Sequence, residues 1–100
     1  MPVIKDPEGF ETIALYAMLD FRGLSVLEVG CGDGRLTWRY ADQAERVTGI
    51  DPDQKAIQAA QANTPARLQG RVSFHTSPLE DFVALVRSSR FDLALFSWSL

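Results

Sequence analysis

The sequence predicts an α/β fold in which a mostly parallel sheet carries helices on both faces. Short apolar segments alternate with helical patterns along the chain, and strands joined in this way pair in parallel through right-handed crossovers. Residues 24–29 are apolar almost throughout, which is typical of a parallel strand covered on both sides. Glycines follow the first of these strands and an acidic residue follows the second. Both lie at the sheet edge where such folds bind ligands.

The first helix is expected to begin at Asp6-Pro7-Glu8 and to end near Asp20. Aspartate is a favoured N-cap residue, proline fits the first turn, and the glutamate lies at the positive end of the helix dipole. Apolar residues then recur with helical spacing, namely Phe10, Ile13, Ala14, Ala17 and Met18. The first strand is expected over residues 24–29.

The remaining elements follow from the same patterns. In chain order we expect a helix over 35–44, a strand over 46–50 ending at Asp51, a helix over 54–63, a strand over 72–75, a helix over 79–86 and a strand over 91–96. Pro65 stops the third helix. The fourth strand lies near the end of the sequence, so we expect a sheet truncated after it, with an exposed apolar edge that could pair with another chain.

Length and composition predict a single domain over residues 1–100. Apolar residues make up 46% of the chain and charged residues 23%, as in globular domains. The net charge is −3 and the arginines are dispersed, so nothing in the charge favours binding to nucleic acid. A small-molecule partner is expected instead.

Other features point to a cytoplasmic protein that needs no metal. Cys31 is the single cysteine, which excludes an internal disulfide and suits a reducing compartment. The N-terminal residues lack the apolar stretch of a signal peptide, and no apolar run is long enough to span a membrane. No group of His, Cys and Asp has the spacing of metal ligands.

The stretch VLEVGCGDG at residues 26–34 is the most informative feature of the chain. Glycine can adopt positive φ and lets a backbone approach a ligand closely. A dinucleotide fingerprint reads G-x-G-x-x-G, with its third glycine one helical turn further on. Here the sixth position is Arg35 and the third glycine, Gly34, comes early. The spacing therefore argues against an NAD or FAD site.

This pattern resembles the first motif of class I S-adenosylmethionine-dependent methyltransferases. The resemblance implies a Rossmann-like, three-layer α/β/α fold and S-adenosyl-L-methionine as methyl donor. It implies that the glycine loop passes under the methionine and ribose, that Glu28 orients the loop and the amino-acid end, and that Asp51 accepts hydrogen bonds from both ribose hydroxyls. Pro52 would border the adenine. The implied cofactor-binding residues are Glu28, Gly30, Cys31, Gly32, Gly34, Asp51, Pro52, Leu79 and Ser97.

The adenine end departs from the family pattern. The family often places an aspartate after its third strand, where it meets the adenine amino group, but this chain has Pro78. The Leu79 amide is still expected to reach the ring, and Glu80 or Asp81 could replace the missing acid. Ser97 belongs to the segment that faces the methyl donor in the family. No catalytic base is predicted.

The function expected is methyl transfer from S-adenosylmethionine to a small molecule. Two alternatives remain: a truncated, catalytically incompetent fragment that binds cofactor or a partner, and an NAD- or FAD-dependent oxidoreductase. Individual residues also have alternatives. Asp51 could be the N-cap of the following helix, Asp33 could cap the helix after the loop or touch the ligand, and Cys31 suits packing better than nucleophilic catalysis.

Overall fold

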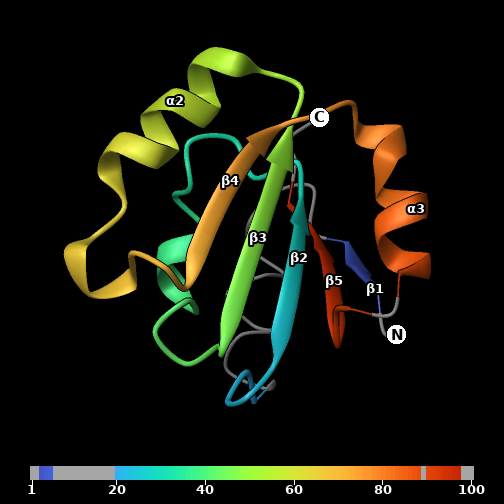
Figure 1. Cartoon of the computed structure of the whole chain (residues 1–100), viewed down its shortest axis with the longest axis horizontal. Coiled ribbons are helices and arrows are strands. Elements are labelled where there is room, and N and C mark those ends of the chain that lie inside the picture. Colours follow the sequence, from blue (N-terminus) through green and yellow to red (C-terminus); the bar gives the residue numbers. More distant parts are fainter. Residues whose placement is uncertain (1–2, 6–19, 89, 98–100) are drawn as a thin grey trace.

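The computed structural model describes residues 3–5, 20–88 and 90–97, with only the backbone described for 3–5. These residues form a five-stranded sheet of order β1-β5-β2-β3-β4 (Figure 1). Its members are β1 (Val3–Lys5), β2 (Ser25–Val29), β3 (Arg46–Asp51), β4 (Val72–Thr76) and β5 (Leu93–Phe96). All the paired strands run parallel. The predicted α/β class and its four predicted strands are confirmed.

The outer strand β1 corrects the expectation of a free fourth-strand edge. Val3 pairs with Ala94 and Lys5 with Phe96, so β5 lies between β2 and β1. The edge expected to support self-association is therefore occupied by the chain's own N-terminal segment. A three-residue strand is too short to show the alternation that reveals strands in a sequence, so no pattern predicted it.

The helix over 54–63 is confirmed as α2 (Gln54–Asn63). Its N-cap is Asp53, whose Oδ1 accepts hydrogen bonds from the amides of Lys55 at 3.0 Å and Ala56 at 3.2 Å. Asp53 thus fills the capping role that was one alternative for Asp51. A short 3₁₀ helix, η2 (Ala66–Leu68), then leads to β4.

The helix predicted over 79–86 is split. It begins as the 3₁₀ helix η3 (Leu79–Asp81) and continues as α3 (Phe82–Arg87). The helix predicted to start at Asp6 lies outside the described residues.

The prediction of a regular helix over 35–44 is wrong. The segment is a series of turns around the 3₁₀ helix η1 (Thr37–Arg39). Its backbone hydrogen bonds mix the 3₁₀ and α patterns. Tyr40 N and Ala41 N, three and four residues further on, both donate to Thr37 O, at 3.2 and 3.0 Å. In 3₁₀ geometry, side chains three residues apart lie in line. Thr37 and Tyr40 therefore point to the same place, which is the buried carboxylate of Glu28.

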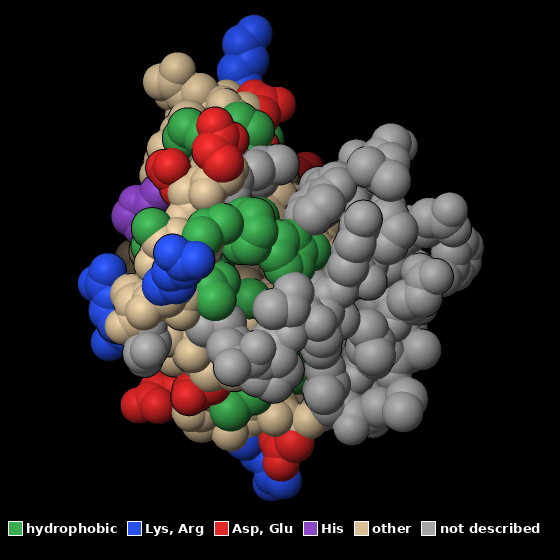
Figure 2. Space-filling model, turned by 90° about the vertical axis from the view of Figure 1, so that its right-hand side faces the viewer, with side chains coloured by type: hydrophobic (Ala, Val, Ile, Leu, Met, Phe, Trp, Pro, Cys, Tyr) green, Lys and Arg blue, Asp and Glu red, His purple; other side chains and the backbone are tan. Residues whose placement is uncertain are grey.

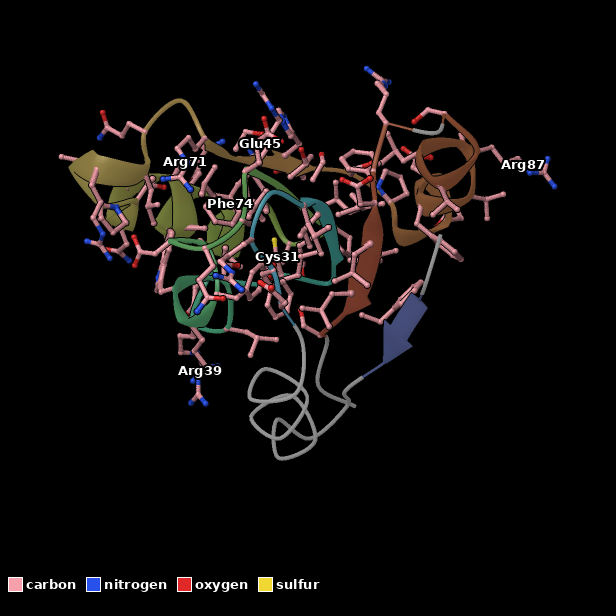
Figure 3. All side chains as sticks on the ribbon, turned by 90° about the horizontal axis from the view of Figure 1, so that it is seen from below. Cys31, Arg39, Glu45, Arg71, Phe74 and Arg87 are labelled. Atoms are coloured by element: carbon pink, nitrogen blue, oxygen red, sulfur yellow. The ribbon has the colours of Figure 1, made fainter. Side chains whose placement is uncertain are left out.

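The sheet separates two hydrophobic clusters, which makes the fold three-layered. One cluster includes Tyr40 and Ile57, so residues 36–44 and α2 cover that face. The other includes Leu27 and Phe96, against which Phe82 of α3 packs. Figure 3, which looks along the sheet from below, shows α3 on the side opposite η1.

The two faces are covered unequally. None of the residues of α3 is buried, and Val83 is 43% exposed. Figure 2 looks at this side of the molecule and shows hydrophobic side chains gathered near its centre, with a basic group beside them and acidic groups above and below. By contrast, Ile57 and Ala60 of α2 are fully covered.

A side chain at Gly49 is expected to destabilise the fold, because β3 passes close to the side chains of Phe74 and Cys31 at this position. A Cβ at this position would lie 2.7 Å from the Phe74 ring and 2.9 Å from Cys31 Sγ. Gly49→Ala should therefore lower the free energy of unfolding by about 1–3 kcal/mol, the usual cost of overpacking. Urea denaturation measures it. The effect should shrink in a Phe74→Val background, and an equal cost there would contradict this account.

Candidate functional site

The glycine loop begins directly after β2 and is held against the end of β3. The amides of Gly30 and Cys31 both donate to Ile50 O, at 2.8 and 3.1 Å, and Gly34 N donates to Cys31 O at 3.1 Å. The φ angles of Gly30, Gly32 and Gly34 are 79°, 57° and 89°. These values lie in the left-handed region that favours glycine, so the loop path requires this composition.

Asp51 joins the loop to the end of β3. Its Oδ2 accepts a hydrogen bond from Gly32 N at 3.0 Å, and its Oδ1 accepts one from Asp53 N at 2.8 Å. The side chain is partly exposed. A carboxylate has about four lone-pair sites, so acceptor capacity remains for a ligand. The structure thus brings together the acid and the glycine loop that the sequence placed at neighbouring strand ends.

The loop does not present a phosphate site. The amides of Gly30, Cys31, Gly32 and Gly34 already have acceptors within the protein. No regular α-helix follows, so there is no helix N-terminus to attract a pyrophosphate. The loop instead offers a close backbone surface beside a carboxylate, which suits a ligand with hydroxyl groups and no phosphate.

The absence of a regular helix also rules out the helix-cap alternative for Asp33. Its Oδ1 accepts from the backbone and side-chain Nε of Arg35, both at 3.2 Å. This is a local turn on the surface rather than a helix cap. The Asp33 side chain is 44% exposed, so it remains open to solvent at the rim of the loop.

Glu28 lies in the centre of the sheet and is fully buried. Its Oε1 accepts hydrogen bonds from Thr37 Oγ1 at 2.8 Å and Tyr40 OH at 2.5 Å, and its Oε2 accepts one from Ser97 Oγ at 2.6 Å. Burial raises the pKa of Glu28, and the three hydroxyls oppose that shift. The carboxylate has no exposed surface, so its geometry suits orienting the loop rather than touching a ligand.

Ser97, immediately after β5, contacts the start of the loop. Its amide donates to Val29 O at 3.0 Å, and its hydroxyl lies 3.2 Å from Gly30 O. The side chain is partly exposed. Ser97 is therefore the predicted site residue that contacts both the buried carboxylate and the loop. The neighbouring Trp98 lies outside the described residues.

Cys31 is a packing residue. The side chain is buried beside Phe74 (Figure 3), and burial, with the nearby charges of Glu28 and Asp51, raises the thiol pKa far above its usual value. A thiol that stays protonated is a poor nucleophile. The thiol packs as a small buried group and lies 3.7 Å from Gly32 O, as a weak donor.

At the predicted adenine end, the structure brings an acid to the end of β4. Ser77 N donates to Asp51 O at 3.0 Å, which ties β4 to β3. Ser77 Oγ donates to Asp81 Oδ2 at 2.7 Å. Asp81 is exposed, as are Pro52 and Pro78. Of the two candidates for the missing acid, Asp81 is therefore the one bonded to the end of β4.

A groove of about 530 Å³ lies on the α3 side of the sheet, beside β4. Its apolar floor includes Ile50, Leu85 and Phe91, and its polar rim includes His75 and Arg90. None of the nine predicted cofactor-binding residues lines it. It meets the predicted adenine end at Ser77 and Asp81, which also line it.

Sequence reasoning missed Thr37 and Tyr40. Both hydroxyls contact Glu28, although the predicted helix over 35–44 gave neither residue a polar role. The available signal was the acidic residue inside a buried strand, since a buried carboxylate needs donors. The i, i+3 spacing of two hydroxyl residues was the pattern that could have supplied them.

The described residues hold neither a metal-binding cluster nor a membrane-spanning helix. Among them, no group of three or more His, Cys, Asp or Glu side chains could hold a metal ion. No helix within the part of the chain that the structure describes is long and apolar enough to cross a membrane.

Comparison with known proteins agrees with the geometry of the loop. Residues 26–100 match the family model described as a methyltransferase domain. The chain is 35% identical over 92 residues to a ubiquinone biosynthesis O-methyltransferase of Methylobacterium sp. (strain 4-46), covering 91% of the chain and 32% of that protein. It is 35% identical over 74 residues to a tRNA (uracil-5-)-methyltransferase homolog A of Mus musculus, covering 74% of the chain and 12% of that protein.

A solved structure shows the same fold. The S-adenosylmethionine-dependent methyltransferase from Mesorhizobium loti superposes with a TM-score of 0.64 at 28% identity, covering 84% of the chain and 38% of that structure. The chain thus spans well under half the length of each of these relatives. The family match argues against the oxidoreductase alternative. So do the position of Gly34, which does not fit the dinucleotide fingerprint, and the loop amides, which already donate to acceptors within the protein. The chain belongs to the class I S-adenosylmethionine-dependent methyltransferases, and its cofactor is S-adenosyl-L-methionine.

Proposed function

We propose that residues 1–100 form one cofactor-binding domain of an enzyme that methylates a small molecule. The observation that carries the proposal is the bond between Asp51 and Gly32, which holds a carboxylate with spare acceptor sites against a loop of occupied amides. S-adenosylmethionine has a ribose diol and no phosphate, so it matches such a surface.

The proposed contacts follow the geometry of the loop. The backbone of Gly30, Cys31, Gly32 and Gly34 would face the methionine and ribose, and the Asp51 carboxylate would accept from the ribose hydroxyls. Pro52 and the Leu79 amide would border the adenine. Ser97 would lie toward the amino-acid end, since it already contacts Gly30. Glu28 acts from below the loop, because its carboxylate is fully buried.

The proposed reaction is in-line transfer of the methyl group. The carbon–sulfur bond of the sulfonium breaks as a nucleophilic O, N or C atom of the acceptor attacks, and S-adenosylhomocysteine leaves. Such a transfer depends mainly on proximity and orientation of the reactants. The described residues supply the donor side. No residue is assigned as the catalytic base.

A small-molecule acceptor is supported by charge and by one relative. The net charge is −3, which disfavours a polyanionic substrate. The ubiquinone biosynthesis O-methyltransferase aligns with nearly the whole chain. The single buried thiol suits a reducing compartment, so we propose a cytoplasmic location. The alternative is that the chain binds the cofactor without catalysing transfer.

Calorimetric titration tests the cofactor assignment. We expect saturable binding of S-adenosylhomocysteine to the protein and no binding of NAD at the same concentrations. Absence of S-adenosylhomocysteine binding at millimolar concentration would overturn the proposal. A transfer assay with methyl-labelled cofactor and a panel of metabolites then separates the two alternatives, because a binding-only domain would label no acceptor.

A further inference from the structure

We infer that Thr37 and Tyr40 are positioning residues for the glycine loop and act on it through Glu28. The inference rests on the proposed function, in which the loop holds the cofactor. Neither residue belongs to the loop, and Tyr40 is fully buried, with 1% of its surface exposed. Their effect on a ligand must therefore pass through the carboxylate that both contact.

The position of Glu28 links the two ends of the loop. Glu28 lies in β2, two residues before Gly30, and its two partners follow Gly34 by three and six residues. Both hydroxyls donate to the same oxygen, Oε1. The segment that leaves the loop is thereby fixed to the strand that enters it. The in-line arrangement of residues 37 and 40 in a 3₁₀ turn makes this shared contact possible.

The second carboxylate oxygen extends the network to the loop backbone. Ser97 Oγ lies 2.6 Å from Glu28 Oε2 and 3.2 Å from Gly30 O. A series of contacts thus runs from Tyr40 and Thr37 through Glu28 and Ser97 to the first carbonyl of the loop. A shift of the carboxylate would move the groups that hold the loop at both ends.

This arrangement is not required to stabilise the core. Burying a carboxylate is costly, and apolar residues of similar size are often as stabilising at such positions. The Tyr40 ring already packs on Phe21, with ring centroids 4.8 Å apart and stacked. The hydroxyl adds the bond to Glu28 and an interaction with Thr37. What the hydroxyl groups contribute is a fixed direction for the carboxylate, and hence for the loop.

Amide hydrogen exchange of the ligand-free protein tests the inference directly. Tyr40→Phe keeps the stacked ring and removes one donor, and Thr37→Val removes the other with little change of shape. We expect the Gly32 and Gly34 amides to exchange about tenfold faster in either variant, the effect of losing one hydrogen bond to a charged group. Thr37→Ser, which keeps the hydroxyl, should restore wild-type exchange.

The matched control is Ile57→Val, which weakens the same hydrophobic cluster from α2 without touching the network. Relative to wild type, exchange of the loop amides in Ile57→Val should be accelerated no more than exchange of the β3 amides. The inference is overturned if the loop amides are unchanged in Tyr40→Phe, if Ile57→Val accelerates them equally, or if Thr37→Ser behaves like Thr37→Val.

Binding of S-adenosylhomocysteine gives the second readout, measured where each variant is fully folded. We expect Tyr40→Phe and Thr37→Val to weaken binding about tenfold, and Thr37→Ser and Ile57→Val to leave it unchanged. If the wild-type protein binds no S-adenosylhomocysteine, the proposed function fails, and the exchange measurement still decides whether these residues position the loop. Unchanged affinity in both hydroxyl-deleted variants would overturn the inference.

Discussion

Asp51→Ala is expected to weaken S-adenosylhomocysteine binding by about a hundredfold or more. Each hydrogen bond to a charged group contributes about 1.5–3 kcal/mol, and the variant would lose the proposed bonds to two ribose hydroxyls. It would also lose the contact with Gly32 N that holds the loop. Calorimetric titration measures the change. The affinity of Asp51→Asn for S-adenosylhomocysteine should lie between those of wild type and Asp51→Ala, since its amide group keeps one acceptor oxygen.

Asp53→Ala is the matched control for Asp51→Ala. Asp53 lies two residues away and also accepts two backbone amides, but these belong to the first turn of α2. Its loss should cost about 1 kcal/mol of stability, as for other N-caps. Binding measured well below the melting temperature should remain close to wild type. Equal loss of binding in both variants would mean that Asp51 acts only through the stability of this region.

Much of the fold could be predicted because the relevant patterns are local. The strand that became β2 is apolar almost throughout, and the helix that became α2 has an aspartate at one end and Pro65 after the other. Glycine at positions 30, 32 and 34 allows positive φ angles, and the structure has them. Such features depend on neighbouring residues, so the sequence displays them directly.

The features that were not predicted depend on residues far apart in the chain. The segment 35–44 has helical periodicity, but Thr37 and Tyr40 turn toward a carboxylate supplied by β2. Likewise β1 is formed only because β5 offers it an edge. Tertiary contacts outweigh helix propensity, which differs by less than about 1 kcal/mol between ordinary residues. A sequence pattern alone cannot weigh these contacts.

The same argument applies to Glu28. Its place in the motif indicated a role near the cofactor but not whether the carboxylate would be exposed or buried. That depended on Ser97, which is 69 residues away, and on the conformation of the segment after the loop. The sequence therefore predicted that Glu28 lies near the cofactor site. It could not predict that the carboxylate is buried and acts through the loop.

Glu28→Ala is expected to destabilise the folded state severely. The change would leave the buried hydroxyls of Thr37 and Tyr40 without the carboxylate, at about 1–3 kcal/mol for each unsatisfied buried group. Together these losses are a large part of the total stability of a typical domain, about 5–15 kcal/mol. Circular dichroism and urea denaturation would detect the loss. A folded Glu28→Ala protein of near wild-type stability would show that the buried hydroxyls find other acceptors when the carboxylate is removed.

Glu28→Gln is expected to fold and to remove a dependence of stability on pH. The folded pKa of Glu28 is raised above its usual value of 4.5, so above that pH the folded state binds more protons than the unfolded state. The contribution of Glu28 to stability is therefore complete below pH 4.5 and declines as the pH rises through the folded pKa. Each unit of the rise corresponds to about 1.4 kcal/mol. Glutamine keeps an acceptor for Thr37 and Tyr40 and cannot titrate.

The informative quantity is the difference in unfolding free energy between wild type and Glu28→Gln, measured by urea denaturation from pH 4 to pH 8. It should shift in favour of the variant as the pH increases. The hydrogen bond from Arg22 lowers the pKa of Asp20 to about 2, and that from Arg67 lowers the pKa of Asp42, which gives stability the opposite slope. Both proteins share that slope, so the difference cancels it. A difference that is constant with pH would show that the buried carboxylate titrates as it does in the unfolded chain, and one that shifts in favour of wild type would show that folding lowers the pKa of Glu28.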